Sequence, residues 1–216
     1  MGYVFLQCLD ETCRLRFPAA AAEAVGLVCP RCRGPLAATD RVERAPFDPP
    51  TRLAHPPLVA LLDNIRSIHN VGSMFRSADG AGVDHLHLLG ITATPAHPRL
   101  AKAALGAHET VAWTHHRHGP DAAARLRREG YTLWALERTA EPARQSSLYE
   151  TVPPPGPLAL IVGNERAGVD PDLLALCDGV FALPMSGGKS SLNVAVAFGI
   201  AVYHLRFGAK AAVSTR

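Results

Sequence analysis

The pattern that most constrains the fold begins at Leu58, where short apolar runs start to alternate with helix-like segments. Six runs have the length of strands: residues 57–63, 83–90, 110–115, 131–137, 158–163 and 180–185. Helix-like segments lie between or after them, at residues 71–82, 98–105, 120–130, 170–177 and about 191–207. This alternation predicts an α/β fold in which helices flank a mostly parallel sheet. Ligands of such sheets bind beyond the carboxyl ends of the strands.

The cysteines indicate a second, smaller module before this domain. Four of the five lie near the start, with four residues between Cys8 and Cys13 and two between Cys29 and Cys32. Two close pairs can place four thiolates around one Zn²⁺ ion, as in zinc ribbons. Two disulfides or four unrelated thiols are the alternatives, and a reducing compartment disfavours the disulfides. Gly34 suits the tight turn that wraps such a metal.

These features divide the chain into three parts. Residues 1–36 form a zinc-ribbon-like module that is too small to fold by burial alone, so metal would supply much of its stability. Residues 37–57 are interpreted as a linker, because they combine several prolines and charges without periodicity. Residues 58–216 form the α/β domain.

Composition limits the location and the partners. Of the 216 residues 48% are hydrophobic, yet no apolar run is long enough to span a bilayer, and the first residues lack the pattern of a signal peptide. We expect a cytoplasmic protein with no membrane partner. The net charge of +3 permits a nucleic-acid partner without demanding one.

The stretch GGKSS at residues 187–191 is similar to the end of the phosphate-binding loop of nucleotide triphosphatases. That loop needs a glycine five residues before Gly188, and the position holds Leu183 instead. Pro184 also lacks the amide that a phosphate cradle needs. ATP or GTP hydrolysis is therefore disfavoured, and Lys189 is left either to touch a nucleic-acid phosphate or to face water.

Three loops after strand ends combine glycines with polar side chains. They resemble, in order, the three signature motifs of the SpoU (TrmH) family of RNA ribose 2′-O-methyltransferases, within the SPOUT superfamily. The matching residues are Asn70, Gly72 and Arg76 in NVGSMFR; Gly163, Glu165 and Gly168 in GNERAG; and Pro184, Met185, Ser191, Leu192 and Asn193 in LPMSGGKSSLN. The resemblance reaches from Leu58 to about Phe207.

The resemblance carries expectations about fold and partners. It implies about six parallel strands and a C-terminal segment that threads through a loop as a deep trefoil knot. It also implies an obligate homodimer in which both subunits contribute to the active site. The implied cofactor is S-adenosyl-L-methionine, and the implied substrate is structured RNA, either tRNA or rRNA.

Six residues are expected to bind the cofactor by this resemblance. Leu183, Met185 and Leu192 would wrap the adenine together with backbone amides, and a glycine would let the backbone approach the ribose or methionine part. For the leucines and the methionine, ordinary core packing is the alternative. The full set is Leu136, Gly163, Gly168, Leu183, Met185 and Leu192.

The same resemblance assigns the catalytic set, which is Asn70, Arg76, Glu165, Ser191 and Asn193. Transfer to a ribose hydroxyl requires that the 2′-oxygen be positioned and that its proton leave. Because a guanidinium stays protonated, we assign Arg76 to gripping a phosphate or the 2′-oxygen rather than to acting as a base. Asn70 would hold the ribose or Arg76, and Glu165 would orient Arg76 or order its own loop. Ser191 and Asn193 would bind substrate or fix their loop, and a purely capping role is the alternative for Asn193.

Two positions depart from the family pattern. Ala195 stands where the family often has serine, and the segment before Asn70 lacks the usual proline. Inactivation is not expected from these departures, because Asn70, Arg76, Glu165 and Asn193 are all present. Two rival functions are a catalytically inactive RNA-binding adaptor and a SPOUT enzyme that methylates a base. The presence of Arg76 argues against the adaptor.

Two further clusters invite interpretation. His115, His116 and His118 suggest a metal site, but the first two would point oppositely on a strand, which favours a surface or RNA-facing loop. Four arginines lie beside the cysteines and motivate the hypothesis that the zinc-ribbon-like module helps to capture RNA; they are Arg14, Arg16, Arg31 and Arg33.

Overall fold

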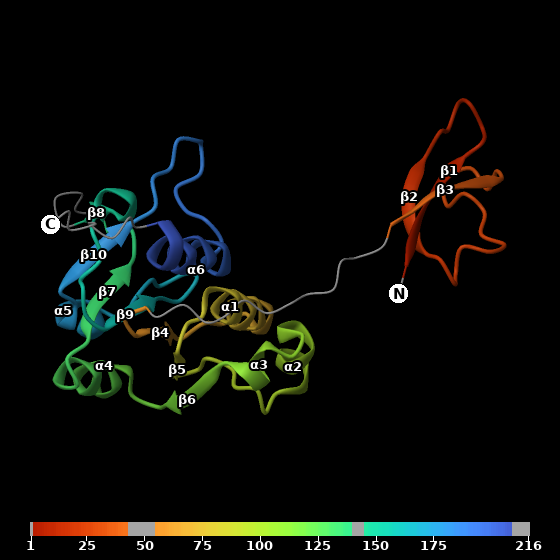
Figure 1. The fold of residues 1–216 in the computed structure, drawn as a ribbon. Helices are drawn as coiled ribbons and strands as arrows, with labels where there is room; N and C mark the ends of the chain where they lie inside the picture. Colours follow the sequence, from red (N-terminus) through yellow and green to blue (C-terminus); the bar gives the residue numbers. More distant parts are fainter. Residues whose placement is uncertain (1, 43–54, 140–144, 209–216) are drawn as a thin grey trace, which may run out of the picture. The chain divides into compact units, whose positions relative to one another are not determined.

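The computed structural model describes residues 2–42, 55–139 and 145–208. The chain divides into two units, residues 1–51 and 52–216 (Figure 1). Each unit is described below by itself.

The N-terminal unit is a three-stranded antiparallel sheet. Its strands are β1 (Tyr3–Cys8), β2 (Arg16–Ala20) and β3 (Leu36–Val42), in the spatial order β2-β1-β3. The linker expected from residue 37 therefore begins inside β3, and the boundary predicted at residue 36 is too early. Strand β3 pairs with β1 along the edge opposite β2 and so satisfies the backbone hydrogen-bonding groups there. The side chains of residues 37–42 do not indicate this pairing in the sequence. The rest of the expected linker, residues 43–54, lies outside the described residues.

The C-terminal unit is built on a seven-stranded sheet whose paired strands are all parallel, as predicted. The spatial order is β6-β5-β4-β9-β7-β10-β8. The strands are β4 (Leu58–Asp63), β5 (His85–Leu89), β6 (Ala112–His116), β7 (Thr132–Leu136), β8 (Ser146–Ser147), β9 (Leu158–Val162) and β10 (Gly179–Ala182).

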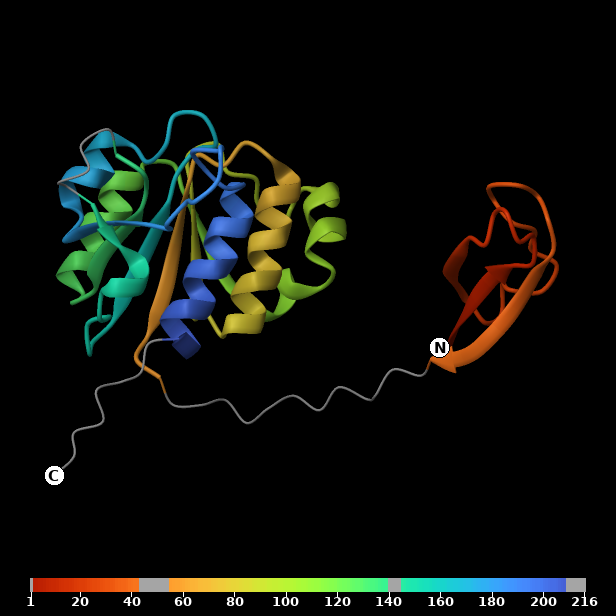
Figure 2. The same cartoon turned by 90° about the horizontal axis from the view of Figure 1, so that it is seen from above.

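Helices cover both faces of this sheet (Figure 2). One face carries α1 (Ile68–Ala81), α2 (Pro98–Ala104), α3 (Ala107–Thr110) and α6 (Val194–Tyr203), and the other carries α4 (Gly119–Arg128) and α5 (Pro171–Leu176). Strand β4 is buried along its whole length because it lies between these layers. Ala60 and Leu62 join the core under α1 and α6, whereas Val59 and Leu61 join the core under α4 and α5. Adjacent strand residues point to opposite faces, so a continuous apolar run is what this position requires.

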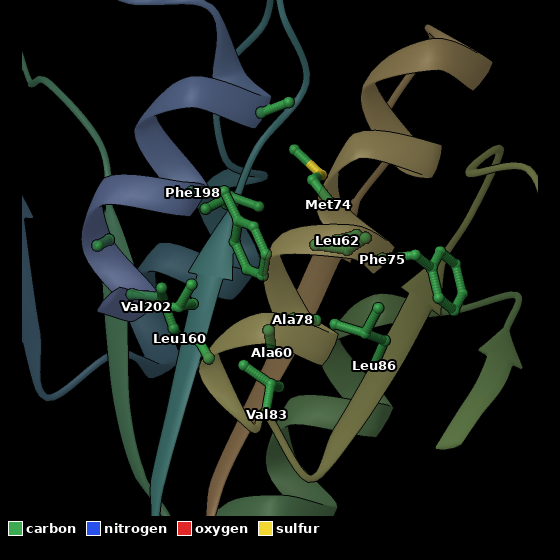
Figure 3. Packing of buried hydrophobic residues seen from close by; sticks show 14 of the residues in the cluster. Ala60, Leu62, Met74, Phe75, Ala78, Val83, Leu86, Leu160, Phe198 and Val202 are labelled. Carbon is green, nitrogen blue, oxygen red and sulfur yellow. The ribbon is translucent and has the colours of Figure 1, made fainter. Parts of the chain in front are cut away.

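The first core is packed between α1, α6 and the strands. In Figure 3, Phe198 extends from α6 toward α1, and Met74 and Phe75 extend from α1 over the sheet. All three side chains are fully buried. Gly72 allows close packing on the next helix, because a Cβ atom there would lie 2.5 Å from the Ala103 Cβ of α2. This motif-one glycine thus has a packing role.

The last helix begins later than the sequence pattern predicts. It starts at Val194 rather than near residue 191, because the Asn193 side chain accepts hydrogen bonds from the first-turn amides and caps the helix. It then ends as a π-helical turn, η3 (His204–Gly208). Among the described residues, none of the helices has the length and apolar character of a membrane span.

Candidate active site

Hydrogen bonds join one residue from each of the three motif loops. Glu165, in the loop after β9, accepts from the Asn70 Nδ2 of α1 at 2.8 Å through its Oε1. The Asn70 Oδ1 in turn accepts from the Asn193 Nδ2 at the start of α6 at 3.1 Å. Parallel strands end at the same edge of a sheet, so loops far apart in the sequence meet there. Asn70 is the central member of this chain of three side chains.

Glu165 also fixes the backbone that enters α1. Its two carboxylate oxygens accept from the amides of Arg66 at 2.9 Å and Ser67 at 3.0 Å. Burial alone would raise the pKa of Glu165, but these amides and the Asn70 side chain lower the pKa below its ordinary value. Glu165 is therefore ionised at neutral pH and orders its surroundings as an anion.

Asn193 combines the link to Asn70 with a cap. Its Oδ1 accepts from the amides of Ala195 at 2.9 Å and Val196 at 3.3 Å, while its Nδ2 donates to Asn70. One side chain thus satisfies the amides that begin α6 and ties that helix to α1. The capping alternative and the loop-fixing role hold together in this geometry.

Two further contacts bind the loop after β9 to the end of β4. The Asn164 Nδ2 donates to the Asn64 carbonyl at 2.7 Å, and the Asp170 amide donates to the Asp63 Oδ2 at 2.9 Å. Asp63 is only 2% exposed, and burial raises the pKa of its carboxyl group. These residues were not predicted from the sequence. The signal available was an acidic residue, Asp63, at the last position of a strand that ends at the ligand-binding edge.

A pocket of about 430 Å³ opens beside this network. All six predicted cofactor residues line it, together with Glu165, Ser191 and Asn193. The lining combines apolar side chains with polar and charged ones, which suits an amphiphilic ligand such as S-adenosyl-L-methionine, and the volume lies in the range of small-molecule sites. Eight lining residues were not predicted, among them Glu137, Arg138, Asn164 and Arg166.

The two predicted glycines of the second motif are required by the backbone around the pocket. A Cβ atom at Gly163 would lie 2.2 Å from the carbonyl carbon of Gly168, and Gly168 itself has a φ of 76°. Gly168 and Asn164 exchange two backbone hydrogen bonds of 2.9 Å. The loop therefore folds back on itself so tightly that positions 163 and 168 do not accommodate a side chain.

Arg76 stands apart from the hydrogen-bonded network. It is exposed on α1 and makes no hydrogen bond or ion pair within residues 2–42, 55–139 and 145–208. It lies six residues after Asn70, a distance of about 9 Å along a helix. Glu165 contacts Asn70 and the amides that lead into α1, and within the described residues it makes no contact with Arg76.

The four N-terminal cysteines come together in a separate cluster. Their Sγ atoms all lie within 4.8 Å of one another. The Cys8–Cys32 and Cys13–Cys29 separations are 3.4 and 3.7 Å, far beyond the disulfide length of about 2.05 Å. A tetrahedral zinc ion with bonds of about 2.3 Å would place sulfur atoms about 3.8 Å apart. The donor set therefore fits zinc.

The turns around this cluster have a repeated form. Arg14 follows Cys13 and Arg33 follows Cys32, and both arginines adopt left-handed φ angles, of 47° and 65°. Arg33 thus adopts the left-handed backbone, and Gly34 lies next to it in the turn where the sequence placed it, with its amide donating to the Cys32 Sγ at 3.4 Å. Gly34 is still constrained, because a Cβ atom there would lie 3.2 Å from the Cys32 Sγ.

The histidine run at the end of β6 is not gathered into a metal site within the described residues. The His115 Nε2 contacts the Gly90 carbonyl at 2.9 Å, whereas the His116 Nε2 contacts the His87 Nδ1 at 3.0 Å. The two neighbours therefore have separate surroundings, as expected for adjacent strand residues. In the described part of the chain, the cysteines form the one cluster that is suited to a metal ion.

Known proteins resemble the C-terminal unit. The chain is 38% identical over 160 residues to the 23S rRNA (guanosine(2553)-2′-O)-methyltransferase RlmP of Bacillus subtilis, covering 73% of this chain and 61% of the relative. It is 32% identical to the tRNA (guanosine(18)-2′-O)-methyltransferase of Thermus thermophilus, covering 70% and 75%. The chain thus spans less than two thirds of the Bacillus relative.

Solved structures of RNA methyltransferases also resemble the C-terminal unit. An AdoMet-bound rRNA methyltransferase from Sinorhizobium meliloti matches with a TM-score of 0.65 and 25% identity, over 73% of this chain and 60% of that one. A TrmH-family RNA methyltransferase structure from Porphyromonas gingivalis matches with a TM-score of 0.63 and 30% identity, over 72% and 61%. Residues 57–203 match the SpoU rRNA Methylase family. The chain belongs to this family.

Proposed function

We propose that the protein transfers a methyl group from S-adenosyl-L-methionine to a ribose 2′-hydroxyl in RNA. The observation that carries this proposal is the joining of the three motif loops, through Glu165, Asn70 and Asn193, beside a pocket lined by all six expected cofactor residues. The named activities of the Bacillus and Thermus relatives support the same reaction.

The chain's own residues have separable tasks in this reaction. When bound, S-adenosyl-L-methionine supplies the methyl group on a sulfonium. Leu183, Met185 and Leu192 offer the apolar wall for the adenine. Arg76 has no partner among the described residues, so its guanidinium is available to grip a phosphate or the 2′-oxygen and to stabilise negative charge as the proton leaves. The proton then passes to that phosphate or to water.

The substrate is a structured tRNA or rRNA. Both classes occur among the relatives' names, and both Bacillus and Thermus proteins act on guanosine. We accordingly place the protein in the cytoplasm, where these RNAs are found. A base-methylating enzyme and an inactive RNA-binding adaptor remain the alternatives that the test must separate.

The protein acts as a homodimer. Helix α6 is apolar on every side, and its outer residues Val196 and Tyr203 remain 51% and 47% exposed although the opposite side is buried against α1. Phe207 of the following turn η3 is 57% exposed. A helix that is apolar all round normally has neighbours all round. A second copy of the chain is the occupant that the family resemblance supplies.

The N-terminal unit binds structural zinc through Cys8, Cys13, Cys29 and Cys32. The sulfur spacing supports a tetrahedral ion, and a unit of this size has little apolar core to replace it. A role in capturing RNA rests on Arg14, Arg16, Arg31 and Arg33. Deletion of residues 1–51 should then weaken RNA binding and spare cofactor binding, and unchanged RNA affinity would remove this role.

The deep C-terminal knot is the finer part of the proposed fold. The segment after β10 supports threading, because it reaches Arg138 through Ser190 and Asn70 through Asn193. An experimental structure traced through residues 137–203 should show α6 drawn through a loop. An unthreaded trace would contradict the knot.

The reaction is tested by the position of the methyl group. RNA from a strain that lacks the protein is incubated with the purified enzyme and labelled cofactor, then hydrolysed with alkali. Label in alkali-resistant dinucleotides is the expected result, because a 2′-O-methyl group blocks cleavage of the next phosphodiester bond. Label in a methylated base would show the base enzyme instead, and cofactor and RNA binding without any transfer would show the adaptor.

A further inference from the structure

Residues 184–192 form an exposed loop that supplies part of the cofactor pocket. Met185, Ser190, Ser191 and Leu192 all line that pocket, so the position of the loop sets its shape. The loop includes two adjacent glycines, and a Cβ atom on either one would meet nothing within 4 Å. Neither packing nor regular structure therefore fixes the middle of the loop, and ordering it costs conformational entropy.

One hydrogen bond holds this loop to the rest of the unit. The Arg138 Nη1, just beyond the end of β7, donates to the Ser190 carbonyl at 2.6 Å. Across the described ranges, no other hydrogen bond of residues 184–192 is present. The next anchor along the chain is Asn193. The loop is thus tied at one intermediate point between β10 and the cap of α6.

The base of Arg138 is itself firmly placed. Its amide donates to the Glu137 Oε1 at 2.7 Å, and the Glu137 Oε2 accepts from the Val169 amide at 2.9 Å. Glu137 therefore connects Arg138 to the loop after β9, which forms another wall of the pocket. Through these contacts the guanidinium projects from a fixed backbone toward a loop that has no other hydrogen bond among the described residues.

We propose that Arg138 is a positioning residue that latches residues 184–192 in the shape that binds S-adenosyl-L-methionine. This inference rests on the proposed function only for the identity of the ligand. Hydrogen bonds from charged donors are stronger than neutral ones, although exposure to water reduces their net value. Arg138 would act on affinity for the cofactor through the loop, and not on the reacting atoms.

The sequence provides a direct probe of the loop. The chain has three lysines, Lys102, Lys189 and Lys210, and Lys189 lies inside the loop. A lysine-specific protease therefore reports on the loop through cleavage after Lys189, which mass spectrometry separates from the other two cuts. Substituting Arg138 with alanine changes none of these sites. Arg128→Ala, on the exposed last turn of α4, is a control with the same change of charge.

In the absence of cofactor, Arg138→Ala should speed cleavage after Lys189 by about fivefold, whereas Arg128→Ala should leave it unchanged. Calorimetry should show the Kd for S-adenosyl-L-methionine rising about three- to tenfold, with kcat at saturating cofactor within about twofold of the wild type. Arg138→Lys, tested for affinity only, should recover part of the binding.

The outcomes separate the latch from other roles. Unchanged cleavage after Lys189 in Arg138→Ala would overturn the latch, and a fall in affinity without faster cleavage would make Arg138 a direct ligand instead. A wild-type protein that binds no S-adenosyl-L-methionine would refute the proposed function. The protease result would still decide whether Arg138 holds the loop, because it is obtained without cofactor.

Discussion

Asn70, Glu165 and Asn193 act through specific donors and acceptors. Asn70 uses its amide nitrogen toward Glu165 and its amide oxygen toward Asn193, so neither an aspartate nor a leucine preserves both contacts. Glu165 gathers three donors on its carboxylate. Substituting these residues therefore tests the geometry of the site separately from the chemistry of Arg76.

Glu165→Gln should lower kcat by about 10- to 100-fold, because a glutamine places its own amide donor against a backbone donor and loosens the start of α1. The folded state should persist, since the side chain is exposed. Steady-state kinetics and thermal unfolding measure the two effects. Glu129→Gln, on the exposed end of α4, is the matched control. Wild-type kcat in Glu165→Gln would show that this carboxylate does not order the site.

Stability should fall in acid because of a buried histidine. Burial, with the neighbouring His85, His116 and Arg125 charges adding to it, lowers the pKa of His87 to about 3. In the unfolded chain, the His87 side chain has a pKa near 6.5. Below that pH it therefore binds a proton in the unfolded chain that it does not bind in the folded one. The contribution of neutral His87 is complete above about pH 6.5 and declines as the pH falls toward about 3.

His87→Leu should remove part of this dependence. Between pH 7 and pH 4 the wild type should lose about 2 kcal/mol more unfolding free energy than the variant, measured by urea denaturation at each pH. His118→Leu, at an exposed position, should behave as the wild type does. Parallel pH curves for the wild type and His87→Leu would contradict the assignment.

The sequence located residues better than it located their contacts. The second and third motifs pointed to the pocket-lining residues Gly163, Met185 and Leu192. Asp63, Glu137 and Arg138 were missed, because their roles depend on which backbone amides and carbonyls lie opposite them. Such partners come from loops about 30 to 110 residues away, and a linear pattern does not encode them.

At the scale of elements, long apolar runs were predictable and short edge elements were not. The runs that became β4 and β9 are continuous because both faces of each strand are buried. Strand β8 contains two serines, and α3 has four residues, so neither carries a period that a sequence pattern can detect. Strand β3 was missed because pairing with β1, rather than apolar content, places it.

The N-terminal unit should depend on metal. Cys29→Ser should abolish stoichiometric zinc and unfold residues 1–51, because one lost thiolate opens the tetrahedral set. Cys177→Ser, at a cysteine outside the cluster, should retain zinc. Metal analysis and two-dimensional NMR measure both effects. Full zinc content in Cys29→Ser would refute the four-cysteine site, and unfolding of the C-terminal unit on metal removal would refute its independence.

At the scale of the whole molecule, the exposed side of α6 is proposed to be covered by a second copy. Val196→Glu should convert the dimer to a monomer, because it places a charge on the apolar surface. An acidic residue in the first turn of a helix is favourable, so the monomer should stay folded. Light scattering coupled to size exclusion measures the mass, with the exposed Arg128→Glu as a control. A dimeric Val196→Glu protein would contradict this interface.

The central claim is that the C-terminal unit forms a catalytic centre in which Arg76 contacts the RNA. The most direct measurement is single-turnover transfer of labelled methyl to RNA, with enzyme in excess, comparing wild type with Arg76→Ala. We predict alkali-resistant label with the wild type, and a rate about 1,000-fold lower with the variant, whose Kd for S-adenosyl-L-methionine is unchanged because Arg76 lies outside the pocket lining. Equal rates for the two proteins, or no transfer by the wild type to any tRNA or rRNA, would contradict the account.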